Sequence, residues 1–390
     1  MTNRLKVLIL ASWYPSREHP TRAVFVREHA KAVSLFDDVR VLCAPDPKPN
    51  LKHLWQLELE TDSAVSEQIS TYRLSYRHLR FFKLSYFTYL WSILRAYQTI
   101  VRTGFRPDVI HAHVYELGIP AVILGKIFRT PVVITEHFSE FLWKVIRGKE
   151  LWKAKLAFGM ANRVITVSHA LQQAIEAYGI KAEFRVIPNP VASEFFHMIS
   201  DHRNNTSTFH LLFVGGLERH HKKGVPFLLR ALSQLATHRR DWHMDIIGDG
   251  ETRREYESLK AELGLTDFVS FHGNKPRAEV VKFMHRANLF VLPSLWETFS
   301  VVTAEALASG TPVIVTRCGG PEEFVTPEVG TVVPKGDSEA LANALRLALD
   351  HLPAFNHQKL TEYARSRFSP EVVGKMTHDM YMGILSPDEY

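Results

Sequence analysis

The sequence predicts an α/β protein with two doubly wound parallel sheets, and three observations lead to this fold class. Short β-branched segments alternate with amphipathic segments, which is the pattern of strand–helix–strand units. The chain has 390 residues, whereas a single hydrophobic core rarely organises more than about 250–300. The alternation is interrupted between Asn189 and Thr208, where Asn, Asp, Ser and Thr accumulate. We therefore expect two domains that meet near this segment.

The expected strands form two series, one in each half of the chain. The first series is Lys6–Leu10, Val39–Cys43, Val109–His113, Val132–Glu136, Val164–Val167 and Arg185–Ile187. The second is His210–Val214, Met244–Ile247, Val269–Phe271, Leu289–Leu292 and Pro312–Thr316, with amphipathic helices at Phe227–Ala236 and Glu279–Ala287. Ligands of open parallel sheets bind beyond the carboxyl ends of the strands, so two such domains face to face would line a cleft with their strand-end loops. Residues that carry chemistry are therefore expected directly after strands.

Composition and cysteine usage limit the class of protein. Hydrophobic residues make up 46% and charged residues 23% of the chain, which argues against disorder or a fibrous architecture. The only cysteines, Cys43 and Cys318, are far apart in sequence, as expected in a reducing compartment. The apolar segment Leu84–Leu94 is shorter than the roughly 20 residues that a membrane-spanning helix needs. We expect a cytoplasmic protein, either free there or bound peripherally to the inner face of the membrane.

One segment is strongly basic, although the net charge of the whole chain is only +6. No acidic residue occurs between Glu67 and Asp108. The cations there are Arg73, Arg77, Arg80, Lys83, Arg95, Arg102 and Arg106, and they alternate with Tyr72, Tyr76, Phe81, Phe82, Tyr86, Phe87, Tyr89 and Trp91. Such a segment either contacts anionic lipid headgroups or is a solvated basic face above a core-facing aromatic stripe. Nucleic acid is not an expected partner, because no recognised binding motif accompanies the basic residues.

The most informative motif is PSLWETFSVVTAEALASGTPVIV, which begins directly after an expected strand. Ser300 is the expected N-cap of a helix over Val301–Ser309, and Gly310 is expected to end that helix. The backbone N–H groups of Phe299, Ser300 and Val301 would then face outward at a helix N-terminus, which suits a diphosphate.

Two carboxylates, Glu297 and Glu305, lie before and inside this helix. Carboxylates would repel a bare phosphate, but they hydrogen-bond the hydroxyls of a sugar and a ribose that flank a diphosphate. This arrangement points to a nucleotide-sugar. The alternative is an exposed loop glutamate and a helix-surface glutamate, which either residue taken alone would favour.

With these two glutamates the chain resembles the retaining glycosyltransferases of family 4, also called glycosyltransferases group 1. Their signature is two glutamates separated by seven residues in a setting of P-S-x-x-E-x-F-x-x-x-x-x-E-A-x-A-x-G-x-P-V-I, and Glu297 and Glu305 match it. The resemblance implies the GT-B fold, in which two Rossmann-like domains face each other and a C-terminal helix crosses back to the first. It also implies that Glu297 contacts the transferred sugar, that Glu305 contacts the nucleotide ribose, and that transfer needs no metal ion or other cofactor.

A second match is LLFVGGLERHHKKGVPFLLRAL, at the first strand of the second half. The resemblance implies that Lys223, followed by Gly224, places a cation on the diphosphate, where negative charge grows in the transition state. The alternative is a solvated basic loop. Family members commonly carry Arg after the Val-Gly pair as a second diphosphate ligand, whereas this chain has Gly216 there. Arg219 is the candidate replacement.

Shorter matches follow later strands of the second half. IIGDGETRREY resembles the turn that contacts the nucleobase through its backbone and implicates Gly248, Asp249 and Gly250, although such a sequence alone is more often only a tight turn. FHGNKPRAEV, with Asn274, resembles the neighbouring wall of the nucleotide site. CGGPEEFV resembles the segment that closes the donor domain, with Glu322 or Glu323 near the base or ribose.

Matches in the first half concern the acceptor and the donor sugar. SWYPSREHPTRAVFVREHAKAV resembles the loop and helix after the family's first strand, with Arg22 and Ala23 on the acceptor side, and Ala23 stands where the family usually has Gly. In DVIHAH, alternation puts His111 and His113 on one side of their strand, and we assign His113 to the acceptor side. In ITEHFSEF, His137 matches a family position that contacts the donor sugar; the alternative is a structural histidine. A metal site here is not expected, because no ligand spacing supports it.

The sequence therefore predicts a glycosyltransferase with residues 1–195 as the acceptor-binding domain, 209–368 as the nucleotide-sugar-binding domain and 369–390 as a C-terminal helix. The expected reaction moves a sugar from a UDP- or GDP-sugar to a hydroxyl of a saccharide or lipid-linked acceptor, in polysaccharide, glycolipid or other glycoconjugate synthesis. No residue stands out as a covalent nucleophile, so the leaving phosphate oxygen is expected to take the acceptor proton. The alternatives are a non-catalytic nucleotide-sugar-binding protein and an epimerase or phosphorylase of the same fold.

Overall fold

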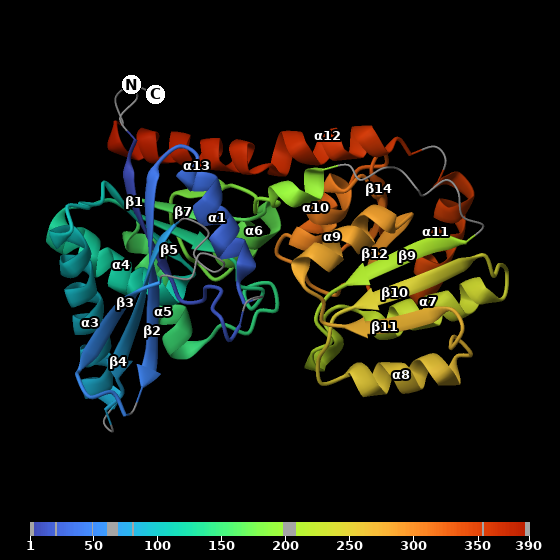
Figure 1. Ribbon diagram of the computed structural model, residues 1–390, viewed down its shortest axis with the longest axis horizontal. Coiled ribbons are helices and arrows are strands. Elements are labelled where there is room, and N and C mark those ends of the chain that lie inside the picture. The colour runs from blue at the N-terminus through green and yellow to red at the C-terminus, as the bar shows by residue number, and fades with distance from the viewer. Residues whose placement is uncertain are drawn as a thin grey trace. The chain divides into compact units, whose positions relative to one another are not determined.

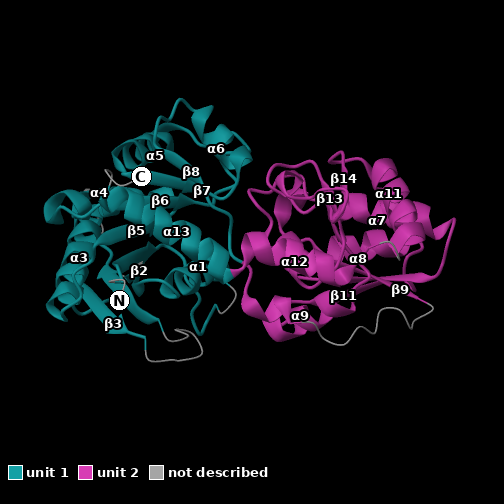
Figure 2. Cartoon of the chain, turned by 90° about the horizontal axis from the view of Figure 1, so that it is seen from above, with its two compact units in different colours: residues 1–190, 370–390 teal, residues 191–369 magenta. Residues whose placement is uncertain are grey.

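The computed structural model describes residues 4–19, 22–48, 50–60, 69–79, 82–197, 208–352 and 355–386 (Figure 1). The chain divides into two compact units. Unit 1 comprises Met1–Pro190 and Pro370–Tyr390, and unit 2 comprises Val191–Ser369 (Figure 2). Each unit is an α/β domain around its own sheet, so the predicted fold class is confirmed.

The sheet of unit 1 has eight strands in the order β3-β4-β2-β1-β5-β6-β7-β8. Their bounds are β1 Lys6–Ala11, β2 Asp38–Lys48, β3 Trp55–Leu59, β4 Ser70–Arg77, β5 Val109–His113, β6 Val132–Glu136, β7 Arg163–Thr166 and β8 Phe184–Val186. Neighbouring strands are parallel except β3 and β4, which form an antiparallel pair at one edge. The strand order reverses at β1, between β2 and β5, which is where open parallel sheets bind ligands.

Helices cover both faces of this sheet. Their bounds are α1 Val24–Ser34, α3 Phe82–Arg102, α4 Tyr115–Phe128, α5 Gly148–Met160, α6 His169–Glu176 and α13 Pro370–Leu385. Helices α1 and α13 pack over one face, where Val7, Ile9 and Val133 share a buried cluster with residues of both helices. Helix α4 covers the opposite face, because a Cβ at its Gly118 would meet Ile134, the residue after Val133. The C-terminal helix thus returns to unit 1, as the predicted fold class requires.

The sheet of unit 2 has six strands in the order β11-β10-β9-β12-β13-β14, all parallel. The strands are β9 Phe209–Val214, β10 Trp242–Ile247, β11 Val269–Gly273, β12 Leu289–Leu292, β13 Val313–Thr316 and β14 Gly330–Val333. The helices are α7 Val225–Ala236, α8 Arg253–Glu262, α9 Arg277–Arg286, α10 Val301–Ala308, α11 Ser338–His351 and α12 His357–Phe368. The order reverses at β9, so the loops after β9 and β12 leave the sheet side by side.

Some elements are not predicted by the sequence pattern. The edge strand β3 is half-exposed along its length and carries polar residues, so it lacks the apolar run of a buried strand. Strand β14 begins at Gly330, where a Cβ would lie 2.2 Å from the Val313 carbonyl oxygen.

Helix α3 runs for 21 residues. None of the helices among the described residues combines the length and the apolar character needed to cross a bilayer.

Candidate functional site

The loop between β12 and α10 holds the first predicted carboxylate in a fixed position. Glu297 forms an isolated parallel bridge with Gly319: its N–H donates to the Cys318 carbonyl over 3.1 Å, and its carbonyl accepts from the Gly320 N–H over 2.8 Å. A Cβ on Gly320 would lie 2.5 Å from the Phe299 Cα, so only glycine allows this approach. The segment that closes the sheet after β13 therefore clamps the loop that carries Glu297.

The side chain of Glu297 meets Lys223, which is 74 residues away in sequence. The Lys223 Nζ lies 2.7 Å from Oε1 of Glu297, and the Ser294 hydroxyl donates to the same oxygen over 2.7 Å. The side chains of Lys223 and Glu297 are 29% and 11% exposed. The structure thus brings two of the three predicted catalytic residues into direct contact.

Backbone packing explains why Lys223 reaches this position. Gly224 has φ +68°, and a Cβ there would lie 1.8 Å from the Pro293 carbonyl oxygen. The Leu295 N–H donates to the Lys222 carbonyl over 2.7 Å. The loop after β9 is therefore pinned to the loop after β12, and a side chain at position 224 would force the two loops apart.

The N-terminus of α10 differs from the prediction in one respect. Ser300 occupies the N-cap position, but its hydroxyl makes a 2.7 Å hydrogen bond with Oγ1 of Thr303 instead of capping a backbone N–H. Its backbone is left-handed, with φ 74° and ψ 77°. The Thr303 N–H donates to the Ser300 carbonyl over 3.2 Å, so the N–H groups before it are the ones that a helix start leaves for other partners. Phe299 beside them is buried and packs against Phe324 and Phe368.

The other predicted donor residues of α10 are less buried. Val301 begins the helix and Glu305 lies one turn further, and both are half-buried. Helix α10 ends at Ala308, one residue before the expected end, and Gly310 follows with φ +72°. The helix itself, its start and its glycine stop agree with the sequence prediction.

The loop of Gly216 and the turn of Gly248 are packed against each other. Cβ atoms on Gly248 and Gly250 would lie 1.9 Å from the Gly215 oxygen and 2.1 Å from the Leu217 oxygen. Asp249 accepts from the Gly250 N–H over 2.8 Å and pairs with Arg253. These glycines therefore serve close backbone packing, which agrees with the tight-turn alternative and leaves a nucleobase contact untested.

Arg219, Gly216 and Asn274 are the remaining predicted donor residues near this turn. The Arg219 guanidinium pairs with Glu251 and is 77% exposed. At Gly216 a Cβ would come no closer than 3.4 Å to Glu218, so packing does not require glycine there. Asn274 is exposed directly after β11. The predicted roles of Arg219 and Asn274 at the donor stay predictions.

One carboxylate of this region has a role that the motif did not indicate. The carboxylate of Glu322 accepts the N–H groups of Cys318 and Gly319 over 2.9 and 2.8 Å. It therefore caps the turn that holds Glu297. Its position four residues after Cys318 is the signal from which a local side-chain cap could have been proposed.

In unit 1, four histidine rings gather at the carboxyl ends of β5 and β6. His113 and His137 stack with centroids 5.3 Å apart and an interplanar angle of 6°, and His111 stacks on His113 at 4.8 Å. His29 of α1 lies 5.5 Å from His113 and 5.7 Å from His137. The predicted shared side of His111 and His113 is confirmed, whereas the approach of His29 could not be predicted from spacing.

The hydrogen bonds of this cluster indicate how the protons are placed. His113 Nδ1 lies 3.1 Å from His137 Nε2, and His113 Nε2 is buried with no hydrogen-bond partner among the described residues. A buried N–H without an acceptor costs more than an unused lone pair. His113 therefore carries its proton on Nδ1 and donates it to His137. His111 is held at the other end by the Tyr381 and Thr135 hydroxyls.

Burial keeps all four rings neutral. It lowers the pKa of His29 to about 4, and burial together with the charge of His29 lowers that of His111 to about 3. Burial also holds the pKa values of His113 and His137 well below their usual range, with the adjacent rings adding to the effect. His137 can therefore hydrogen-bond a ligand but does not supply a positive charge near neutral pH.

Glu136, beside His137, is bound to backbone. Its carboxylate accepts the N–H groups of Tyr115, His137 and Phe138 over 2.8–3.0 Å. Burial raises the pKa of Glu136 to about 7, and these amide donors oppose the shift. Within the described ranges no three His, Cys, Asp or Glu residues are arranged to hold a metal ion.

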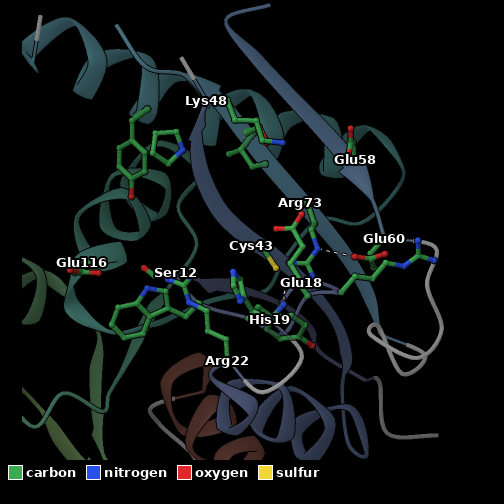
Figure 3. A pocket seen from close by; sticks show the side chains of 18 residues that line it. Ser12, Glu18, His19, Arg22, Cys43, Lys48, Glu58, Glu60, Arg73 and Glu116 are labelled. Carbon is green, nitrogen blue, oxygen red and sulfur yellow. Dashed lines mark hydrogen bonds and ion pairs between the residues drawn. The ribbon is translucent and has the colours of Figure 1, made fainter. Parts of the chain in front are cut away.

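The acceptor-side residues Arg22 and Ala23 lie at the start of α1. Ala23 is the N-cap residue, with a left-handed φ of 49°. The Arg22 guanidinium lies 5.9 Å from the Trp13 ring centroid. Both Arg22 and Trp13 line a pocket of about 680 Å³ at the carboxyl end of the sheet (Figure 3). The pocket also takes Lys48 of β2, Glu58 of β3, Glu60 directly after β3, Arg73 of β4, Tyr89 of α3 and Glu116 of α4.

The basic segment after Glu67 does not form one surface. Arg73 lies in β4, where it pairs with Glu60 over 2.8 Å inside the pocket, and Arg95 lies over the Trp91 ring in α3. Arg80 and Phe81 lie outside the described residues. The segment is split between strand β4 and helix α3. Neither a lipid-contacting surface nor a solvated basic face above an aromatic stripe therefore extends over its whole length.

Comparisons with known proteins agree with this architecture. The chain matches the family model Glycosyltransferase Family 4 over residues 23–195 and the model Glycosyl transferases group 1 over residues 196–367. A glycogen synthase of Mycobacterium tuberculosis is 30% identical over 303 residues, which are 72% of this chain and 69% of that protein. A D-inositol 3-phosphate glycosyltransferase of Pseudarthrobacter chlorophenolicus is 28% identical over 235 residues, 55% of this chain and 56% of the relative.

Solved structures share the fold over nearly the whole chain. Sucrose-phosphate synthase from Thermosynechococcus elongatus has a TM-score of 0.74 at 21% identity and covers 99% of this chain and 100% of its own. Anabaena HepE in complex with UDP has a TM-score of 0.77 at 22% identity and covers 97% and 100%. The two family models, the glycogen synthase and these GT-B structures together show that the chain belongs to glycosyltransferase family 4 and is a hexosyltransferase-type enzyme.

Proposed function

We propose that this enzyme transfers a sugar from a UDP- or GDP-sugar to an acceptor hydroxyl with retention of anomeric configuration. The observation that carries the proposal is the contact between Lys223 and Glu297 beside the N-terminus of α10. A cation and a helix start suit a diphosphate, and an adjacent carboxylate suits a sugar hydroxyl. Solved proteins of the same fold are described with UDP, UDP-glucose and ADP, which supports a nucleotide donor.

The ion pair between Lys223 and Glu297 suggests how the donor is recognised. A diphosphate that approaches Lys223 competes with Glu297 for the ammonium group. Once Lys223 turns to the phosphate, Oε1 of Glu297 keeps only the Ser294 hydroxyl and can accept a hydrogen bond from a sugar hydroxyl. Binding of the donor would thus exchange one charge-assisted contact for two ligand contacts.

The bond changes of the proposed step balance without a protein nucleophile. The bond between the anomeric carbon and the phosphate oxygen breaks, the acceptor oxygen bonds to the same face of that carbon, and the acceptor proton passes to the departing phosphate oxygen. Lys223 and the N-terminus of α10 stabilise the growing negative charge. Glu305 is assigned to the ribose and neutral His137 to a sugar hydroxyl. Glu136 is not a nucleophile in this scheme, because three backbone N–H groups hold its carboxylate.

The pocket of unit 1 is the proposed place of the acceptor. It presents carboxylates and cations together with the aromatic rings of Trp13 and Tyr89, a combination that suits the hydroxyls and apolar faces of a saccharide. We propose a saccharide or lipid-linked saccharide acceptor, no metal ion or other cofactor, and action at the cytoplasmic face of the membrane in glycoconjugate synthesis.

Paired lysine variants test this proposal. In Lys223→Met the cation on the diphosphate is lost, and we expect transfer to fall by about 10²–10³-fold, as for loss of one electrostatic contact to a transition state. Lys222→Met is the matched control, because Lys222 pairs with the exposed Glu218 and should retain most activity. Release of UDP and GDP from a panel of their sugars, with an acceptor panel, provides the assay.

The outcomes separate the remaining function classes. Equal turnover of Lys223→Met, Glu297→Gln and the wild type would refute the assignment of the site. A donor that changes its sugar without an acceptor would indicate an epimerase, and a strict need for free phosphate would indicate a phosphorylase. Thermal stabilisation by a donor with no product across the acceptor panel would indicate a binding protein.

A further inference from the structure

The first turns of α3 have their polarity reversed. Ser85, Thr88 and Ser92 are at most 4% exposed, whereas Leu84 is 49% and Phe87 is 64% exposed. A helix at the surface of a water-soluble protein normally buries its apolar residues and exposes its polar ones. Here the hydroxyls face the protein, and the large apolar side chains point away from it.

Two of the three buried hydroxyls bond to carbonyls of the helix itself, whereas the Ser85 hydroxyl finds no such partner among the described residues and lies beside the Tyr76 hydroxyl. Thr88 Oγ1 donates to the Leu84 carbonyl over 2.7 Å, and the Ser92 hydroxyl donates to the Tyr89 carbonyl over 2.7 Å. On the inward face, the helix backbone therefore satisfies the hydroxyls of Thr88 and Ser92. The outward apolar face needs another explanation, which a covering partner provides.

A second segment with exposed apolar residues lies at the start of α5. Val145 is 54% and Trp152 is 62% exposed. The exposed cations of this segment are Lys144, Arg147, Lys149 and Lys155. Its one acidic residue, Glu150, is paired with Lys153 and accepts from the Tyr115 hydroxyl. The segment therefore presents apolar side chains among cations that outnumber the carboxylates.

The start of α4 joins the two segments into one surface. Burial raises the pKa of the Tyr86 phenol, and the nearby charge of Lys153 opposes the shift. Tyr86 is 37% exposed and stacks on Tyr89 with centroids 5.8 Å apart. The Tyr115 hydroxyl of α4 donates to Glu150 of α5 over 3.2 Å, and Glu116 of α4 lines the same pocket as Tyr89 of α3, so the start of α4 lies between the two segments.

We propose that this surface, formed by Leu84, Tyr86, Phe87, Val145, Trp152 and the cations around them, docks on an anionic lipid bilayer. Aromatic and aliphatic side chains flanked by Lys and Arg are the chemistry that binds the headgroup region of such membranes. A second protein with an apolar face would not need the cations, and nucleic acid would not need the apolar residues. Charge and apolar character together therefore favour the bilayer.

The surface adjoins the pocket of unit 1. Tyr89 and Glu116 line that pocket, and the charge of Glu116 acts on Tyr89, on which Tyr86 stacks. An acceptor whose lipid tail stays in the bilayer would thus present its headgroup at the mouth of the pocket. The docking inference goes beyond the proposed transfer reaction and stands on the surface residues alone.

Co-sedimentation of the full chain with vesicles tests the inference. One set of vesicles contains only phosphatidylcholine, and the other contains equal parts of phosphatidylcholine and phosphatidylglycerol. We expect at least tenfold stronger binding to the anionic set, and loss of that preference as salt rises from about 0.1 to 1 M, over which the screening length falls from about 10 to 3 Å. Equal binding to both sets would overturn the proposal.

Surface variants locate the binding. Phe87→Ser and Trp152→Ser should each weaken binding about tenfold or more, and the double change Lys144→Gln with Arg147→Gln should abolish the preference for anionic vesicles. Leu347→Ser in α11 is the control, because Leu347 is 48% exposed and lies in unit 2. Unchanged binding of Phe87→Ser and Trp152→Ser would overturn the proposal. So would a wild-type dimer that Phe87→Ser dissociates, since a second copy would then cover the face.

Two further measurements keep this inference separate from the proposed reaction. Lys223→Met should bind anionic vesicles like the wild type, whatever its transfer activity. Phe87→Ser and Trp152→Ser should retain thermal stabilisation by a nucleotide donor. Loss of vesicle binding with intact nucleotide binding in Phe87→Ser or Trp152→Ser supports the docking surface. Loss of transfer with intact vesicle binding in Lys223→Met shows that the docking surface does not depend on the transfer site.

Discussion

Acidification should destabilise unit 1 strongly, because four neutral histidines are buried together. The pKa values of His29 and His111 are lowered to about 4 and about 3, and those of His113 and His137 lie well below 6.5. A histidine whose folded pKa is depressed stabilises the fold above its unfolded pKa of about 6.5 and loses that contribution as the pH falls below it. The relevant window is therefore pH 7 down to 4.

The size of the effect hardly depends on the exact folded pKa values. At pH 5 each unfolded ring gains a proton that the buried ring does not take up, which costs about 2 kcal/mol per histidine relative to pH 8. Four rings give a loss on the order of 8 kcal/mol. Glu136 opposes it: its folded pKa of about 7 is above the unfolded value, so protonation returns roughly 2–3 kcal/mol over the same range. The net loss is on the order of 5 kcal/mol, comparable to the whole stability of many domains.

Urea unfolding at pH 8, 7, 6 and 5 measures this loss. His29→Gln keeps a side chain that can hydrogen-bond Asn189 but does not titrate, so it should lose about 2 kcal/mol less than the wild type between pH 8 and 5. His238→Gln, at an exposed histidine of unit 2, is the control. A free energy of unfolding that is constant from pH 8 to 5, or an unchanged slope in His29→Gln, would refute the description of a buried neutral cluster.

Three substitutions test the backbone of the two sites. Gly224→Ala places a Cβ 1.8 Å from the Pro293 oxygen, so urea unfolding should show a loss of well over 1 kcal/mol and thermal-shift titration weaker nucleotide binding. Ala23→Gly relieves a left-handed φ of 49° and should be neutral or stabilise by up to about 1 kcal/mol; a larger loss would show that the Ala23 side chain matters more than its strain. At Gly216 a Cβ would come no closer than 3.4 Å to its neighbours, so Gly216→Arg should tighten UDP binding, whereas clearly weaker UDP binding would show that this loop has no place for a second cation.

The two sheets are predictable from sequence because their central strands are buried on both faces. β5, β6 and β12 are short runs whose every residue is buried, and such runs stand out against the amphipathic helices between them. The edge pair of β3 and β4 is not predictable in this way. An edge strand exposes one side to solvent, so its sequence looks like a loop until its partner is known.

The candidate site shows the same division between local and long-range information. The glutamate spacing and the glycine stop of α10 are local, and the sequence gives them directly. The contact of Lys223 with Glu297 depends on β9 and β12 being neighbours, which follows only from the sheet order. The approach of His29 to His137 depends on which face of α1 is buried, and no spacing rule within either motif carries that information.

Strand-end loops in each of the two units contain strained backbone. Ala23, Val114 and Ser300 are non-glycine residues at helix N-cap positions, and all three have positive φ. Each such residue costs on the order of 1–3 kcal/mol, so it persists only where surrounding packing fixes it. These residues precede α1, α4 and α10, which begin beside the acceptor-side pocket, Glu136 and Glu297 respectively. Backbone strain is common at functional sites, but Arg129 at the C-cap of α4 is left-handed as well, so strain and motif together favour these three helix starts as loops that meet a ligand.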